Sequence, residues 1–383
     1  MAYGDLGAVT DTLSYQAAAS KCHEVVHVVD DIFAVSHRGF SWINLVQTFK
    51  VDALGEIPDT IEDEINHNGN VADDRNRLCK LTDSMYAIAS TDPSYRLMID
   101  TIQILANGQI TDTVLGTFHQ GAVYGMPGKL QKCGPGYLAL SSDNYAHDLG
   151  QVRTFHVYAD GTIDTTIVDT RDFESTACLE PFLAEIHPQI WAVAYKGPDD
   201  HGFIKTLSIS PAGIIGAAAL PSLEFDTAAV LYPTIAKAHG DYVAIGYTDS
   251  AGDGKLAIVE IDSGGAIGAL VKDTYVFEAG EATRVSTYSI GQGYIGVAYS
   301  NVSAQGILKT FLVDGDGKLN DHTIDTLPFV ATGAGHQHVI HATGDVWVVT
   351  HSGPGSTGQV DSFGLETPPE PGFTADLMRG MLR

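Results

Sequence analysis

The stretch 240-GDYVAIGYTDS-250 decides the fold, because similar phrases return at 344-GDVWVVTHS-352 and 291-GQGYIGVAYS-300. Each phrase joins a polar turn to a short apolar strand that contains an aromatic residue. Seven such aromatic residues lie 51 to 54 positions apart along the chain: Phe33, Tyr86, Tyr137, Trp191, Tyr242, Tyr294 and Trp347. A spacing that is kept over the whole chain indicates an array of similar structural units.

Two further markers keep the same period. A hydroxyl residue follows in the next strand, as in LVQTFKV and ILKTFLV, at Thr48, Thr101, Thr154, Thr206, Thr310 and Ser362. Ile258 replaces the hydroxyl in the fifth unit. A glycine in a polar hairpin turn recurs at Gly55, Gly108, Gly161, Gly213, Gly265 and Gly317. Three markers in phase predict seven related units of about 52 residues.

Each unit reads as four short strands, because runs rich in Val, Ile, Tyr and Thr alternate with Gly, Asp and Asn turns. Four-stranded units repeated around an axis are typical of a β-propeller, which here has seven blades. The last unit stops after its third strand, 358-GQVDSFGLE-366. The N-terminal segment 6-LGAVTDTLSY-15 matches the fourth-strand phrase 107-NGQITDTVLG-116, with Gly7 as the turn glycine. We therefore expect the N-terminal strand to close the last blade.

These repeats resemble those of seven-bladed β-propeller proteins over residues 5–366. The resemblance implies an all-β fold of four-stranded blades. The chain lacks the WD dipeptide, the kelch Gly-Gly pair and the Asp-box motif, so no functional subfamily is implied, and a fold alone does not define a function. The predicted domains are a propeller over residues 1–366 and a proline-rich spacer with a short tail over residues 367–383.

Composition excludes several classes of partner. The chain has 21 Lys and Arg against 47 Asp and Glu, a formal net charge of −26, which would repel a nucleic-acid backbone. No apolar run is long enough to predict insertion into a membrane. The N-terminus has neither the basic nor the apolar region of a secretion signal, so we expect a cytoplasmic or virion-associated protein. The four cysteines have no CxxC or zinc-like spacing, which predicts reduced thiols.

The loops that connect successive blades, together with those between second and third strands, are long and variable. Examples are 64-EINHNGNVADDRNR-77 and 117-TFHQGAVYGMPGK-129. In a propeller these loops emerge on one face, whereas the turns on the other face are uniformly tight here. Variable loops on a rigid scaffold are typical of a binding face for a glycan or a protein. Sequence drift in loops that carry no function explains the variation equally well.

Steps of 52 or 53 residues from His23 predict which residues form the mouth of the central channel on that face. Positions two residues further along are added in blades 2 and 7. The predicted ligand-binding set is His23, Arg75, Arg77, Glu180, Tyr232, Arg284, His336 and His338. Arg offers paired donors to a carboxylate or a sulfate, while His and Tyr can transfer protons. The ring therefore favours an anionic ligand.

His336 and His338 lie two residues apart on a predicted strand and so share a face. Either His23 or His27 would join them from the adjoining blade. Three imidazoles could bind Zn²⁺ or another divalent metal, and this is the one cofactor that the sequence raises. A chain with 15 histidines also forms such clusters by chance, which leaves a purely structural role open.

The C-terminal segment combines a proline-rich spacer, 366-ETPPEPG-372, with a short apolar stripe. The stripe is predicted to bind a partner and consists of Phe373, Leu377, Met378, Met381 and Leu382. Packing of this stripe on its own propeller is the alternative.

Two hypotheses for function follow from these features. The first is a non-enzymatic recognition or scaffold propeller that presents its variable face to a glycan or a protein. Its tail would tether it to a larger assembly, for example a virion or phage tail. The second is a polysaccharide lyase that acts on acidic glycans at the channel mouth. In that case Arg75, Arg284 and Glu180 would position a uronate, and the base and acid would come from His23, His336 or Tyr232.

Overall fold

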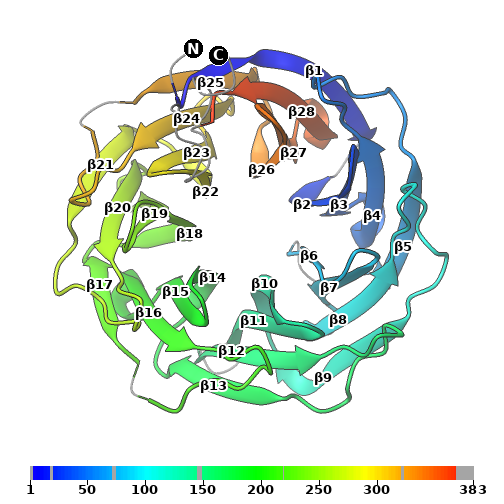
Figure 1. Ribbon diagram of the computed structural model, residues 1–383, viewed down its shortest axis with the longest axis horizontal. Coiled ribbons are helices and arrows are strands. Elements are labelled where there is room, and N and C mark those ends of the chain that lie inside the picture. The colour runs from blue at the N-terminus through cyan, green and yellow to red at the C-terminus, as the bar shows by residue number, and fades with distance from the viewer. Residues whose placement is uncertain are drawn as a thin grey trace, which may run out of the picture.

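The computed structural model describes residues 3–17, 20–70, 75–144, 149–218, 220–320 and 323–367. The described chain forms seven four-stranded antiparallel sheets. They stand around a central axis like the blades of a propeller (Figure 1). The predicted all-β, seven-bladed fold is thus confirmed. No helix in the described ranges is long and apolar enough to cross a membrane.

In each blade the first strand lies nearest the axis and the last lies at the rim (Figure 1). Blade 1 contains β2 (Lys21–Val29), β3 (Ile32–Arg38), β4 (Ile43–Lys50) and β5 (Asp63–Asn70). Blade 2 contains β6 (Arg77–Lys80), β7 (Met85–Thr91), β8 (Arg96–Gln103) and β9 (Gly116–Tyr124). Blade 3 contains β10 (Met126–Gly134), β11 (Tyr137–Asn144), β12 (Leu149–His156) and β13 (Asp169–Glu174).

The remaining blades repeat this arrangement. Blade 4 contains β14 (Leu179–His187), β15 (Ile190–Lys196), β16 (Gly202–Ser208) and β17 (Ser222–Asp226). Blade 5 contains β18 (Val230–Lys237), β19 (Tyr242–Asp249), β20 (Gly254–Glu260) and β21 (Asp273–Glu278). Blade 6 contains β22 (Thr283–Gly291), β23 (Tyr294–Ser300), β24 (Gly306–Leu312) and β25 (Asp325–Val330). Blade 7 contains β26 (Gly335–Thr343), β27 (Val346–Ser352), β28 (Gly358–Leu365) and β1 (Leu6–Gln16).

The N-terminal strand closes the ring, as the sequence predicts. β1 pairs with β28 in antiparallel register, for example with Leu13 opposite Val360. The two ends of the described chain therefore lie side by side (Figure 1). The turn glycine of this blade is Gly4 and not Gly7, because Gly4 has the positive φ of 88° and its N–H donates to the Glu366 carbonyl. The expectation for Gly7 was wrong by three residues.

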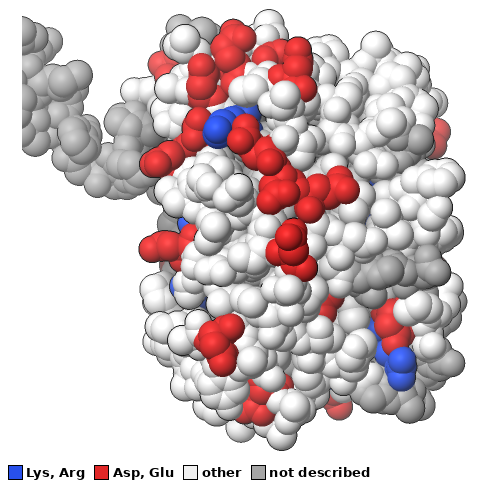
Figure 2. Space-filling view, turned by 90° about the vertical axis from the view of Figure 1, so that its right-hand side faces the viewer, with Lys and Arg blue, Asp and Glu red and all other residues white. Residues whose placement is uncertain are grey.

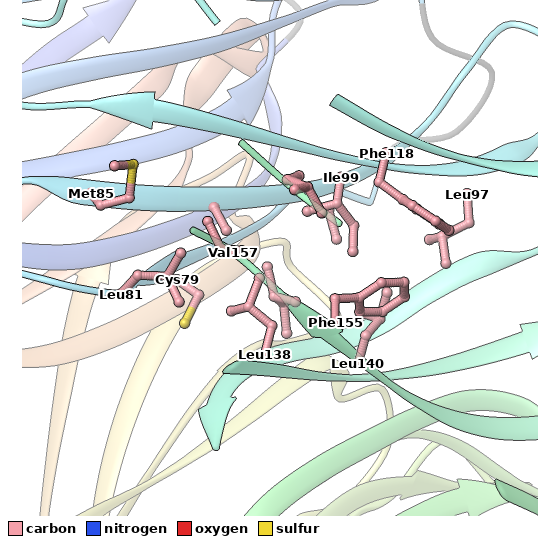
Figure 3. Close-up of a cluster of buried hydrophobic side chains, with 14 residues drawn as sticks. Cys79, Leu81, Met85, Leu97, Ile99, Phe118, Leu138, Leu140, Phe155 and Val157 are labelled. Atoms are coloured by element: carbon pink, nitrogen blue, oxygen red, sulfur yellow. The ribbon is translucent and has the colours of Figure 1, made fainter. Parts of the chain in front are cut away.

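The core consists of separate apolar layers between neighbouring blades. Since each blade packs against a neighbour on both faces, the second strands are largely apolar in their first half, and β3 and β7 are buried along their whole length. The layer in Figure 3 joins blades 2 and 3, with Leu97 and Ile99 from one sheet facing Leu138 and Leu140 from the other. Burial between blades, and not within one sheet, stabilises the ring.

The aromatic markers occupy two adjacent positions of the second strand, which explains their uneven spacing. Phe33, Tyr86, Trp191 and Trp347 lie one residue before the partner of the hydroxyl position, whereas Tyr137, Tyr242 and Tyr294 lie two residues before it. Neighbouring residues on a strand face opposite sides. The first set is buried and the second is half-buried, so the aromatic residues are not structurally equivalent.

The other two markers are the two halves of one contact, which we call the hydroxyl latch. In each case a hydroxyl of one blade donates to the carbonyl of the hairpin glycine in the next blade. The pairs are Thr48 to Gly108, Thr101 to Gly161, Thr154 to Gly213, Thr206 to Gly265, Thr310 to Gly4 and Ser362 to Gly55. Ile258 removes the latch between blades 5 and 6. The two repeated residue types are thus explained by one interaction between blades.

A second contact between blades has no counterpart in the sequence predictions. An aspartate of the rim strand, the first residue of that strand in four of five cases, accepts a hydrogen bond from the backbone N–H two residues after the hairpin glycine of the next blade. The pairs are Asp11 with Ile57, Asp63 with Ile110, Asp169 with Ile215, Asp273 with Leu319 and Asp325 with Leu6. Each hairpin turn is therefore held by its preceding blade through up to two hydrogen bonds.

Thr154→Val tests the hydroxyl latch with little change in side-chain volume. The variant leaves the buried Gly213 carbonyl without its donor, which is 2.6 Å away in the wild type. We expect the free energy of unfolding in urea to fall by about 1–2 kcal/mol. A stabilised variant would contradict the latch, because replacing an unpaired buried hydroxyl with a methyl group is favourable.

Candidate functional site

A bulge at the start of the innermost strand shapes the channel mouth. In six of the seven blades, the pairing of the first two strands skips two residues of the innermost strand near its start. The first skipped residue has a positive φ in five blades, at Cys22, Glu180, Tyr232, Arg284 and His336. Such a bulge redirects side chains that regular pleating would place between the sheets.

The bulge also corrects one predicted position. In blade 1 the skipped residues are Cys22 and His23, so Cys22 is the equivalent of Glu180, Tyr232, Arg284 and His336. The predicted position in blade 1 was therefore one residue too late. His23 accordingly has a different environment: it is buried, its Nε2 lies 3.3 Å from Ser352 Oγ, and its ring is stacked against that of His37.

All seven blades line one cavity of about 140 Å³ at the mouth. Its lining includes every predicted ligand-binding residue, namely His23, Arg75, Arg77, Glu180, Tyr232, Arg284, His336 and His338. The sequence predictions missed Cys22, Glu24, Lys129 and Phe182, which line the same cavity. Cys22 and Glu24 flank His23, and Phe182 lies two residues after Glu180. Lys129 is the blade 3 equivalent of His23. Extension of the periodic step to neighbouring positions would therefore have found all four.

One side of the cavity is occupied by a buried carboxylate with its cations. Glu24 forms an ion pair with Lys129, lies 3.4 Å from His338 Nε2, and has the Arg77 guanidinium 3.9 Å away. Burial opposes ionisation of Glu24, but the Lys129 and Arg77 charges outweigh it and hold its pKa below the ordinary value. Burial lowers the pKa of His338 to about 4, so this imidazole is neutral at pH 7.

The opposite side of the cavity contains Glu180, Tyr232 and Arg284. The Arg284 guanidinium lies 4.7 Å above the Tyr232 ring, which is a cation–π distance. Glu180 accepts a 2.7 Å hydrogen bond from the Tyr232 N–H, and burial raises the pKa of its carboxyl. Arg284 has no carboxylate within ion-pair distance in the described part of the chain. Its charge is therefore available to a ligand.

Arg75 differs from Arg284 in having a partner behind it. Its guanidinium Nη1 lies 3.1 Å from Asp143 Oδ2, and Asp143 is fully buried. Burial raises the pKa of Asp143, while Arg75 acts in the opposite direction. The Asp143 carboxylate also accepts a 3.3 Å hydrogen bond from the Glu180 N–H, which ties blades 2, 3 and 4 together at the mouth.

The predicted metal ligands are not brought together in a chelating group. His336 Nδ1 lies 3.1 Å from Cys22 Sγ, and His338 faces Glu24. His27 lies further along β2, where its Nε2 is 2.8 Å from the Asp30 carbonyl. Within the described ranges no three His, Cys, Asp or Glu side chains could hold a metal ion. Burial and the nearby Arg284 keep the pKa of His336 well below its usual value.

The mouth carries more cationic than anionic side chains, whereas the molecule as a whole is acidic. It contains Arg75, Arg77, Lys129 and Arg284 against Glu24 and Glu180, in a chain whose formal net charge is −26. The outer side in Figure 2 carries many Asp and Glu side chains and few Lys or Arg. A concentration of cations inside a mostly acidic molecule favours a small anionic group over a cationic ligand.

Comparison with known proteins establishes the fold of the chain but not its activity. The chain is a seven-bladed β-propeller. It resembles the periplasmic gluconolactonase PpgL of Pseudomonas aeruginosa, with a TM-score of 0.58 and 13% identity over 85% of this chain and 93% of that one. It also resembles Sqt1 of Chaetomium thermophilum, with a TM-score of 0.53 and 13% identity over 92% of this chain and 87% of that one. No protein-family model and no curated protein matches the chain.

Both propellers share the fold of this chain at identities too low to transfer an activity. The function has to be inferred from the cavity itself. The predicted partner-binding residues Phe373, Leu377, Met378, Met381 and Leu382 lie outside the described residues.

Proposed function

We propose that this protein is a non-enzymatic recognition propeller that binds a carboxylate-bearing ligand at its channel mouth. The observation that carries the proposal is Arg284, a cation that lines the cavity and has no carboxylate partner in the described chain. A ligand carboxylate beside it would form the charge-assisted hydrogen bonds that Arg favours. The Tyr232 ring beneath the guanidinium would hold Arg284 in place for that contact.

The arrangement suits binding better than β-elimination. A lyase needs a base whose pKa lies near the working pH. The pKa of His336 is well below its usual value because of burial and Arg284, which makes it a weak base. His23 is buried against His37, and ion pairs to Glu24 occupy one side of the cavity. These contacts favour recognition over the lyase alternative.

The tether is a separate part of the proposal. The described chain ends at Thr367, whose N–H and hydroxyl both lie within hydrogen-bond distance of Asp345 Oδ1. Blade 7 already has its four strands before residue 368. We propose that residues 368–383 connect it to a larger assembly, in which case their removal should release the propeller from that assembly.

Binding of free glucuronate tests the anion site. Arg284→Gln should weaken glucuronate binding by roughly 10- to 100-fold in calorimetry at pH 7, since a charge-assisted hydrogen bond contributes about 1.5–3 kcal/mol. Arg171→Gln, on the rim strand β13, is the matched control and should bind as the wild type does. Equal affinity in the Arg284 and Arg171 variants would refute the site. Cleavage of a uronate polymer into unsaturated ends would favour the lyase instead.

A further inference from the structure

The loop between β3 and β4 departs from the two loops that share its geometry. Blades 1, 4 and 7 each close this turn with a single 3-10 turn: η1 (Phe40–Trp42), η2 (Pro198–Asp200) and η3 (Pro354–Ser356). In each, the N–H of the preceding glycine donates to the carbonyl of the residue that follows the turn, at 2.7 to 2.8 Å. The three loops are therefore structural equivalents.

The last residue of each turn has a left-handed backbone, and only blade 1 places a large side chain there. The φ values are 63° for Trp42, 66° for Asp200 and 61° for Ser356. Small polar residues tolerate this conformation, whereas a bulky residue in it is an outlier that points to function. Phe40 similarly replaces Pro198 and Pro354. Turn formation alone does not account for an aromatic pair at these positions.

Both aromatic side chains face solvent at the end of blade 1 where the mouth lies. Phe40 is 66% exposed and Trp42 is 50% exposed, although apolar rings of this size are usually buried. The Arg38 guanidinium lies 4.0 Å from the centre of the Trp42 ring and covers part of it. Arg38 pairs with Lys21 across the two strands, and Lys21 directly precedes Cys22 of the cavity lining. The indole thus lies at the same end of blade 1 as the cavity.

We infer that Trp42 and Phe40 form a stacking platform for an acidic oligosaccharide whose uronate carboxylate occupies the mouth beside Arg284. The inference rests on the proposed function and names its ligand class. A pyranose ring presents a flat face of C–H groups to an aromatic ring, while its hydroxyls remain in water, which suits a ring that is half exposed. The glycan would then extend from the cavity over blade 1.

The charge of the molecule restricts which glycan fits. A densely charged polyanion would be repelled by a surface with a net charge of −26, so uronates that alternate with neutral sugars fit best. An acidic peptide fits less well. The Gly39 N–H already bonds to the Ile43 carbonyl, and the turn offers no strand edge to which a peptide could add.

The test compares free glucuronate with a hexasaccharide of alternating glucuronate and N-acetylglucosamine. Trp42→Asn replaces the indole with a side chain that tolerates the left-handed backbone. We expect about a 10-fold loss of hexasaccharide affinity, the order of one aromatic stacking contact, with glucuronate affinity unchanged. Trp191 and Trp347 are buried, so acrylamide quenching of tryptophan fluorescence reports Trp42, and the hexasaccharide should protect it.

The outcomes separate the two proposals. Unchanged hexasaccharide affinity in Trp42→Asn overturns the platform, and leaves the anion site standing if Arg284→Gln still weakens glucuronate binding. Absence of hexasaccharide binding to the wild type also overturns the platform. Tighter, Trp42-dependent binding of a glutamate-rich peptide would overturn the glycan assignment. Melting temperature provides the folding control, and Trp42→Asn should melt at or above the wild-type temperature because backbone strain is relieved.

Discussion

Deletion of residues 1–16 should destabilise the whole propeller, because it removes the rim strand that closes blade 7. Leu13 and Tyr15 on β1 are both buried, and each contributes roughly 1.5–3 kcal/mol through burial. The deletion also removes the Gly4 carbonyl that accepts from Thr310 and the Asp11 carboxylate that accepts from the Ile57 N–H. We expect a loss of roughly 5 kcal/mol or more, within the range of a typical total stability. The measurement is soluble yield together with melting temperature.

A circular permutant distinguishes loss of this strand from general damage. Gly4 and Asp5 exchange backbone hydrogen bonds with Glu366, so the two chain ends already meet as a hairpin would. A chain that starts at Ser20 and carries residues 3–17 directly after Thr367 should fold and melt close to the wild type. The same permutant with residues 3–17 scrambled is the control. Wild-type melting of the simple deletion would refute closure by β1.

Truncation after Thr367 is the matched change at the other end. Under the tether proposal it should leave the melting temperature unchanged. Leu365 is buried and belongs to β28, so a cut before it would disturb the blade and confuse the comparison. A lower melting temperature after truncation at Thr367 would support packing of the tail on its own propeller.

The repeat was predictable from sequence because equivalent positions make similar contacts between blades around the ring. Thr154 and Gly213 were each visible as periodic markers, yet their hydrogen bond was not, since they are 59 residues apart and belong to different blades. The aspartate contact was missed for the same reason. Sequence periodicity identifies equivalent positions, whereas contacts between blades depend on how the blades are placed around the axis.

The lining of the cavity was predictable to within one residue. The periodic step found Glu180, Tyr232 and Arg284 because the bulge recurs at the same place in their blades. His23 also lines the cavity, but it lies one residue after Cys22, the equivalent of Glu180, and the bulge makes neighbouring positions unequal. A comparison of the loops GFSW, GPDD and GPGS would have revealed Trp42 from sequence alone.

The contact between blades 7 and 1, which we call the closing seam, should make the stability of the protein sensitive to acid. His37 is buried there as a neutral imidazole, with Ser20 Oγ 3.0 Å from Nδ1 and Gln47 Oε1 2.9 Å from Nε2. Its ring is stacked on that of His23 at a centroid distance of 6.0 Å. Burial lowers the pKa of His37 to about 4 and that of His23 well below its usual value.

The direction of the pH effect follows from these shifts. An unfolded histidine takes up a proton near pH 6.5, whereas folded His37 does so only near pH 4. The unfolded state therefore binds more protons in this window, and stability is complete above about pH 6.5 and falls as the pH drops toward 4. His37 alone accounts for a loss of about 3 kcal/mol. The raised pKa values of Glu180 and Asp143 act in the opposite direction and offset part of it.

Urea unfolding at pH 7.0 and pH 4.5 should accordingly give a large difference in the wild type and a smaller one in His37→Gln. Glutamine can accept from Ser20 and donate to Gln47, so it keeps the hydrogen bonds without a titrating ring. The matched control is His341→Gln, because His341 is exposed and its Nε2 contacts only the Gly344 carbonyl among the described atoms. Since His37→Gln also changes stability at pH 7, the readout is the difference between the two pH values. An equal difference in wild type and His37→Gln would show that the seam does not set the acid response.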